Sequence, residues 1–168
     1  VDVLADISKE VTGFSDKLRL ELYGTVNHSL IEYIKEKGLG DNFVYKKQIP
    51  REDALKKIAS SQVLLLLLNK ADNAKGRIPG KLFEYLYVKR PILNLGVRAS
   101  DVEQIIKNTK SGISVEYDDY ESIKSLLLER FDLYERGVNY IEQENIDEYD
   151  IENLTKKIAL LLDHFRAS

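Results

Sequence analysis

Five short apolar segments, each followed by a segment with helical periodicity, constrain the fold of this chain more than any other feature. The apolar segments are residues 18–23, 43–48, 63–68, 92–95 and 113–117. Strands that alternate with helices of about ten residues predict a parallel sheet with crossover helices. The run VLLLLL at residues 63–68 is apolar on both faces, so we expect it to be the most buried strand. The pattern therefore predicts an α/β doubly wound domain.

Further helices are predicted at both ends of the chain. Leu4, Ile7, Val11 and Phe14 recur at intervals of three and four residues, which predicts one opening helix. Two closing helices are predicted by apolar residues with the same spacing at residues 123–131 and 154–165. Between them, residues 142–152 contain six acidic side chains and no basic one, so we expect a solvent-exposed connector.

Composition excludes several classes of function. The net charge of −3 gives no basic surface for nucleic acid, and the absence of cysteine excludes disulfides and thiolate metal sites. His28 and His164 are too few and too far apart to predict a metal site. The longest apolar run has six residues, far short of the roughly 20 that a membrane-spanning helix needs. We expect a cytoplasmic protein that binds neither nucleic acid nor a metal.

The segment at residues 69–91 carries the most specific signal. In open parallel sheets, ligands bind at the carboxyl ends of the strands, and this segment contains the longest loop that follows a predicted strand. Pro79 suits the first turn of a helix, and Gly80 leaves the backbone N–H groups there accessible. Lys81 places a cation at the positive end of the helix dipole, which becomes favourable if an anion binds there. The segment predicts a phosphate site, with a solvated surface lysine as the alternative.

Glu84 lies one turn further along the same predicted helix. A lysine that precedes a glutamate is the less favourable order for an ion pair within a helix, so mutual stabilisation explains the two residues poorly. A carboxylate at this position can accept hydrogen bonds from ribose hydroxyls, as acidic residues do in dinucleotide sites. The alternative is an ordinary glutamate on the polar face of a helix.

The sequence GKLFEYL at residues 80–86, followed by KRPIL at residues 89–93, resembles the donor-binding signature of group 1 glycosyltransferases. These are retaining enzymes of the family-four type with the GT-B fold. The resemblance extends over nearly the whole chain through residues 20–24, 59–68, 112–115 and 147–165. It implies that this chain is the C-terminal, Rossmann-like donor-binding domain of such an enzyme.

The resemblance also implies roles for individual residues. Gly80 and Lys81, together with Gly24 and Thr25, would bind the diphosphate of the donor, and Glu84 would bind its ribose. Glu84 matches the second glutamate of the family's motif, and the first, which contacts the sugar, should lie eight residues earlier. Gly76 stands at that position here, so no sugar-binding residue is assigned. No catalytic residue, metal ligand or cofactor is assigned, because the nucleotide-diphosphate sugar is itself the donor substrate.

The domain organisation follows from the same resemblance. Residues 1–146 would form the nucleotide-sugar-binding domain, and residues 147–168 its C-terminal crossover helix. The chain starts at what resembles the helix after the family's first strand, so we expect an interrupted sheet that lacks this central strand, and an N-terminal acceptor domain outside this chain. A glycan or lipid-linked acceptor, polysaccharide biosynthesis and a location peripheral to the inner membrane are implied.

Two alternatives fit the same pattern. One is a domain of a nucleotide-sugar epimerase with a related architecture. The other is a non-catalytic, flavodoxin-like nucleotide-binding or interaction module, in which Lys81 and Glu84 are surface residues without a ligand. As a glycosyltransferase domain, this chain alone is expected to be inactive.

Overall fold

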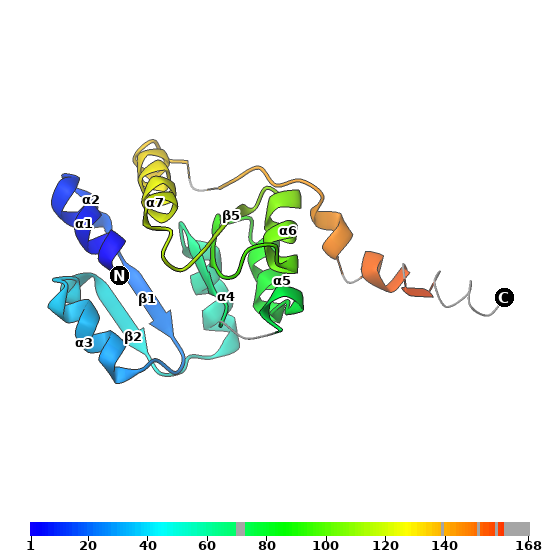
Figure 1. Ribbon diagram of the computed structural model, residues 1–168, viewed down its shortest axis with the longest axis horizontal. Helices are drawn as coiled ribbons and strands as arrows, with labels where there is room; N and C mark the ends of the chain where they lie inside the picture. The colour runs from blue at the N-terminus through cyan, green and yellow to red at the C-terminus, as the bar shows by residue number, and fades with distance from the viewer. Residues whose placement is uncertain (70–72, 139, 151, 157, 160–168) are drawn as a thin grey trace. The chain divides into compact units, whose positions relative to one another are not determined.

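The computed structural model describes residues 1–69, 73–138, 140–150, 152–156 and 158–159. The chain forms two compact units, each of which has its own parallel sheet (Figure 1). The first unit combines Val1–Gln62 with Tyr117–Asn139, and the second combines Val63–Glu116 with Tyr140–Ser168. All five predicted strands are present and all pair in parallel, so the α/β, Rossmann-like class is confirmed.

The first unit is built on a two-stranded sheet. Its elements are α1 (Asp2–Glu10), α2 (Phe14–Lys17), β1 (Leu20–Tyr23), α3 (His28–Glu36), η1 (Gly40–Asn42), β2 (Phe43–Lys46), α4 (Arg51–Ser60) and α7 (Tyr120–Glu135). β1 and β2 lie side by side, with Leu20 opposite Phe43, and α3 makes the crossover between them (Figure 1). Leu20 and Leu22 point to one face of β1, where they pack with the fully buried Ile34 of α3. This face of the sheet is the core of the unit.

The predicted opening helix is two helices. α1 ends at Glu10 and α2 begins at Phe14, because Gly13 adopts a left-handed conformation with φ of 81° that a continuous helix does not permit. The apolar residues still converge as the spacing predicted, since Ile7 and Phe14 are buried in one cluster. Phe14 meets Phe131 of α7 edge to face, with ring centroids 5.1 Å apart. α7 therefore closes the core of the first unit from the far end of the sequence.

α4 forms where the sequence predicted a helix, but its apolar residues are not buried in a core. Within the described residues α4 buries none of its side chains, and Leu55 is 37% exposed. The reason lies in β1, whose second face carries Arg19, Glu21 and Tyr23 in place of apolar residues. α4 meets this face through an ion pair from Lys57 to Glu21.

The second unit is built on a three-stranded sheet in the order β3-β4-β5. Its elements are β3 (Leu64–Leu67), η2 (Ala74–Gly76), α5 (Gly80–Tyr87), β4 (Ile92–Leu95), α6 (Asp101–Asn108), β5 (Gly112–Val115) and η3 (Ile146–Tyr149). α5 and α6 are the crossover helices, and each buries its apolar stripe. The core of this unit includes Leu82 and Leu86 of α5 and Val102 and Ile106 of α6, as their spacing predicted.

β3 is less buried than the sequence predicted. Leu64 and Leu66 are buried, but Leu67 is 57% exposed, whereas the first three residues of β4 are all buried. The difference follows from the strand order, because β4 has a neighbour on both sides and β3 pairs with β4 alone among the described strands. The prediction that residues 63–68 form the most buried strand is therefore wrong.

Among the described residues, the strands form two separate parallel sheets, β1-β2 in the first unit and β3-β4-β5 in the second. The expected absence of a central strand stays a prediction.

The last predicted helix lies partly outside the described residues, which exclude residues 157 and 160–168. Residues 152–156 are helical, and the two described members of its apolar stripe, Leu154 and Ile158, are 37% and 58% exposed. The boundary between residues 146 and 147 stays a prediction.

Candidate functional site

The start of α5 has the main features of an anion-binding site. Pro79 is the N-cap, one position earlier than predicted, and no side chain caps the helix. The first turn therefore presents backbone N–H groups that no capping side chain satisfies. Nothing lies within 4 Å of where a Cβ on Gly80 would be, so the space beside this residue is open. A helix end with these properties favours a bound anion.

Lys81 and Glu84 differ in their surroundings. Lys81 is exposed, and its ammonium makes no hydrogen bond or ion pair to any residue that the structure describes. Glu84 is half-buried on the same helix. Burial raises the pKa of the neighbouring Tyr85, and the charge of Glu84 raises it further.

The opposite face of α5 fixes the helix on its sheet. Leu82 and Leu86 are buried, and the hydroxyl of Tyr85 donates to the carbonyl oxygen of Leu65 in β3 at 3.4 Å. The side chains on the exposed face are therefore presented by a well-anchored helix, at the end of the loop that follows β3.

Gly24 and Thr25 follow the carboxyl end of β1. Gly24 has a φ of 116°, which a residue with a Cβ adopts only with strain, and its N–H donates to the carbonyl oxygen of Lys46 at 3.0 Å. Thr25 is exposed. Gly80, Lys81 and Glu84 share one helix of the second unit, whereas Gly24 and Thr25 belong to the first, and the two groups are not placed relative to one another.

Gly76, where the resemblance led us to expect a glutamate, is the last residue of η2 and is exposed. A Cβ on it would lie 3.9 Å from Oδ2 of Asp101, at the start of α6. A carboxylate from another element thus lies beside this position, which the sequence analysis did not anticipate.

The start of α6 is capped by side chains, which the sequence analysis also missed. Ser100, the N-cap, accepts a hydrogen bond at its Oγ from the N–H of Glu103 at 3.2 Å, and the Glu103 carboxylate accepts one from the N–H of Ala99, the residue before the cap. The spacing Ser-x-x-Glu is the signal that could have revealed this cap. Side chains of the same segment thus satisfy backbone N–H groups at the start of α6, whereas no side chain caps α5.

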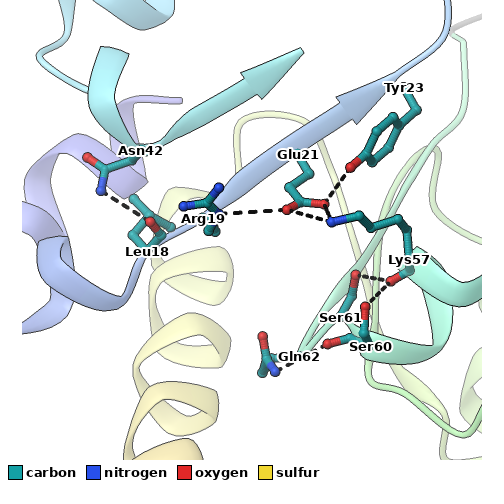
Figure 2. A network of polar contacts seen from close by, with 9 residues as sticks. All are labelled: Leu18, Arg19, Glu21, Tyr23, Asn42, Lys57, Ser60, Ser61 and Gln62. Carbon is teal, nitrogen blue, oxygen red and sulfur yellow. Dashed lines mark hydrogen bonds and ion pairs between the residues drawn. The ribbon is translucent and has the colours of Figure 1, made fainter. Parts of the chain in front are cut away.

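A polar network on β1 is a cluster of charges that the sequence analysis did not predict (Figure 2). Glu21 accepts a hydrogen bond from the Tyr23 hydroxyl at 2.7 Å and pairs with Lys57 of α4 at 3.1 Å, and Arg19 lies 3.8 Å away. Partial burial acts to raise the pKa of Glu21, but the hydrogen bonds from Tyr23 and Lys57 outweigh it and the pKa is lowered. Burial and then the Glu21 carboxylate raise the pKa of Tyr23. With both oxygens of Glu21 engaged, the network joins α4 to the sheet and offers no free base.

His28 is exposed in the first turn of α3, where its Nε2 lies 3.2 Å from Oε1 of Glu32. It belongs to a helix surface. Among the described residues, no three side chains of the metal-binding types come together in a way that could hold a metal ion. In the same part of the chain, no helix is long and apolar enough to cross a membrane.

The fold is Rossmann-like, because crossover helices join its parallel strands. The uncapped start of α5 lies at the end of the loop that follows β3. The chain is similar in structure to a sucrose-phosphate synthase from Thermosynechococcus elongatus, with a TM-score of 0.66 and 14% sequence identity. The match covers 99% of this chain and 42% of the synthase. The chain therefore shares the fold of the matched part of this synthase and spans less than half of its length. No protein-family model matches the sequence, and no curated protein does either.

Proposed function

We propose that this chain is the donor-binding domain of a retaining glycosyltransferase of the hexosyltransferase class. Such an enzyme transfers a sugar from a nucleotide-diphosphate sugar to a glycan or lipid-linked acceptor. The proposal is supported by the GT-B-like fold together with an uncapped, lysine-bearing helix start after β3. The family-four type is part of the proposal and rests on the GKLFEYL sequence at residues 80–86.

On this proposal, the first turn of α5 binds the diphosphate of the donor. The free N–H groups and the helix dipole favour an anion, and the Lys81 ammonium supplies the countercharge. As the sugar leaves, negative charge develops on the diphosphate, and these fixed donors stabilise it electrostatically. Glu84, on the same helix, would accept hydrogen bonds from the ribose.

The rest of the reaction is assigned to parts of the protein outside this chain. An N-terminal domain would bind the acceptor and complete the active site, and no residue of this chain is proposed to act as a catalytic base. Polysaccharide biosynthesis at the cytoplasmic side of the inner membrane is the process that we propose for the complete enzyme.

Calorimetric titration with uridine, guanosine and adenosine diphosphates tests the diphosphate site. Charge-assisted contacts are worth about 1.5–3 kcal/mol, so Lys81→Ala is expected to weaken binding by about tenfold or more. Lys107→Ala is the matched control, because Lys107 is an exposed lysine in the last turn of α6 in the same unit. No binding of any of the three, or unchanged affinity in folded Lys81→Ala, would overturn the assignment.

Glu84→Gln separates the ribose contact from the phosphate contact. The variant keeps the shape of the side chain and removes its charge, so it is expected to weaken nucleoside diphosphate binding while leaving inorganic pyrophosphate binding nearly unchanged. An equal loss for both ligands would argue against a ribose contact, and the amide spectrum of the variant checks that it is folded.

A further inference from the structure

A groove runs along α6 in the second unit, and none of its lining residues belongs to the proposed diphosphate site. It is lined by Ile78, Asp101, Gln104, Ile105, Asn108 and Tyr149 and has a volume of about 460 Å³. Three of these residues, Asp101, Gln104 and Asn108, lie on one stripe of α6 because they are three and four positions apart. Ile105 is buried beside the stripe, and Ile78 is 39% exposed in the segment that precedes α5.

The far wall of the groove is held in place by several hydrogen bonds. The N–H of Glu144 donates to the carbonyl oxygen of Thr109 at 2.9 Å, and Asn145 Nδ2 donates to that of Asn108 at 3.0 Å. Asn108 Nδ2 in turn donates to the Tyr149 hydroxyl at 3.3 Å. The predicted solvent-exposed connector is therefore anchored to the end of α6, and it places a tyrosine in the groove.

The lining favours one chemical class of ligand. Among the described residues that line the groove there is no lysine, arginine or histidine, which argues against a phosphate or another anion. It contains a single carboxylate, too few for a divalent cation, and too many polar groups for a lipid chain. The carboxylate of Asp101 and the amide of Gln104 make no hydrogen bond to any described residue. They offer acceptors and donors to a ligand with several hydroxyl groups.

We propose that this groove binds a neutral carbohydrate of one or two rings. Planar carboxylate and amide groups can bind neighbouring hydroxyls, while Ile78 and the Tyr149 ring provide apolar contact for the C–H face of a sugar. The volume lies within the range of about 300–1,000 Å³ that small-molecule sites occupy. Gly76, beside Asp101, leaves room at the carboxylate that a larger side chain would reduce. This inference goes beyond the proposed function and does not require that a nucleotide binds.

Amide chemical-shift mapping of the full chain tests the inference. The probes are methyl α-glucoside, methyl β-galactoside, N-acetylglucosamine and maltose, each added to about 50 mM, since a weak millimolar site is expected for neutral sugars. We expect at least one probe to shift amides at Gln104, Asn108 and Tyr149. No shift with any of the four, or shifts confined to other parts of the chain, would overturn the proposal.

Substitutions then test the lining itself. Gln104→Ala and Tyr149→Ala are each expected to weaken the observed binding by about fivefold or more, since each removes a direct contact. Lys107→Ala lies on the same helix outside the groove and is expected to change nothing. Because Gln104 is exposed, its truncation should leave the fold intact, and the amide spectrum verifies this. Unchanged sugar affinity in folded Gln104→Ala and Tyr149→Ala would refute the assignment.

Failure of this proposal is distinguishable from failure of the proposed function. The groove is tested with neutral sugars and with residues of α6 and η3, whereas the diphosphate site is tested with nucleoside diphosphates and Lys81. If the protein binds nucleoside diphosphates but no neutral sugar, only the proposal for the groove is refuted. If neutral sugars bind in the groove but nucleoside diphosphates do not bind, only the assignment of the donor site is refuted.

Discussion

Gly112 is the position where a single added methyl group should cost the most. It is the first residue of β5, it has a φ of 152°, and an ideal Cβ on it would lie 2.0 Å from the carbonyl oxygen of Ile92 in β4. Real Cβ atoms stay at least 3.0 Å from such atoms, so β5 would have to move by roughly 1 Å relative to β4. Backbone strain adds about 1–2 kcal/mol and overpacking about 1–3 kcal/mol. Gly112→Ala is therefore expected to destabilise the second unit by about 2–5 kcal/mol.

Alanine variants of two other glycines distinguish the cost of backbone strain from the cost of the steric clash. Gly13→Ala also meets a positive φ, of 81°, but nothing lies within 4 Å of its Cβ, so it should cost only about 1–2 kcal/mol. Gly80→Ala meets neither problem at the start of α5, and it should be neutral or stabilise by up to about 1 kcal/mol.

The assay is urea unfolding followed by circular dichroism, together with hydrogen exchange of the β4 and β5 amides. Hydrogen exchange is needed because each unit has its own core and a single transition cannot be assumed. If Gly112→Ala costs no more than Gly13→Ala, the clash with Ile92 does not limit this position and the reasoning fails.

Two further changes test the core and the polar network. Leu82→Ala is expected to cost about 2–5 kcal/mol in urea unfolding, because Leu82 is fully buried, and a cost below about 1 kcal/mol would contradict its place in the core. The lowered pKa of Glu21 means that its contribution is present above the ordinary pKa of 4.5 and is lost as the pH falls through the lowered value. Glu21→Gln should therefore reduce the loss of stability between neutral and acid pH by up to about 1 kcal/mol, whereas Glu52→Gln, an exposed acid on α4, should not. An equal acid dependence in the two variants would show that the network does not stabilise the fold.

The local elements could be predicted from the sequence because their signals are local. Strand and helix positions follow from apolar spacing: four strands lie within the predicted ranges, and β5 begins one residue before its predicted range, at Gly112. The break between α1 and α2 was missed because the apolar spacing continues through Gly13, and only the left-handed conformation of that residue interrupts the helix. The burial of β3 was overestimated because the sequence of a strand does not report how many neighbours it has.

Some features of the candidate site could likewise be predicted from local sequence, and others could not. The exposure of Lys81 and the burial of Leu82 follow from one helical periodicity and were predictable. The approach of Asp101 to Gly76 depends on how α6 packs against η2, and the pairing of Glu21 with Lys57 joins residues 36 positions apart. Neither contact leaves a periodic signal in the sequence.

The late arrival of α7 has a consequence for the synthesis of the chain on the ribosome. Tyr120 donates to Asp6 at 2.7 Å and Lys124 pairs with Glu10, and in both cases the partners are 114 positions apart. At about 5–20 residues per second, the face of α1 that carries Ile7 waits roughly 6–20 seconds for this partner. All three strands of the second unit are synthesised within that interval. The first unit therefore begins to form before any strand of the second unit is made, and it receives its closing helix only after all three of those strands.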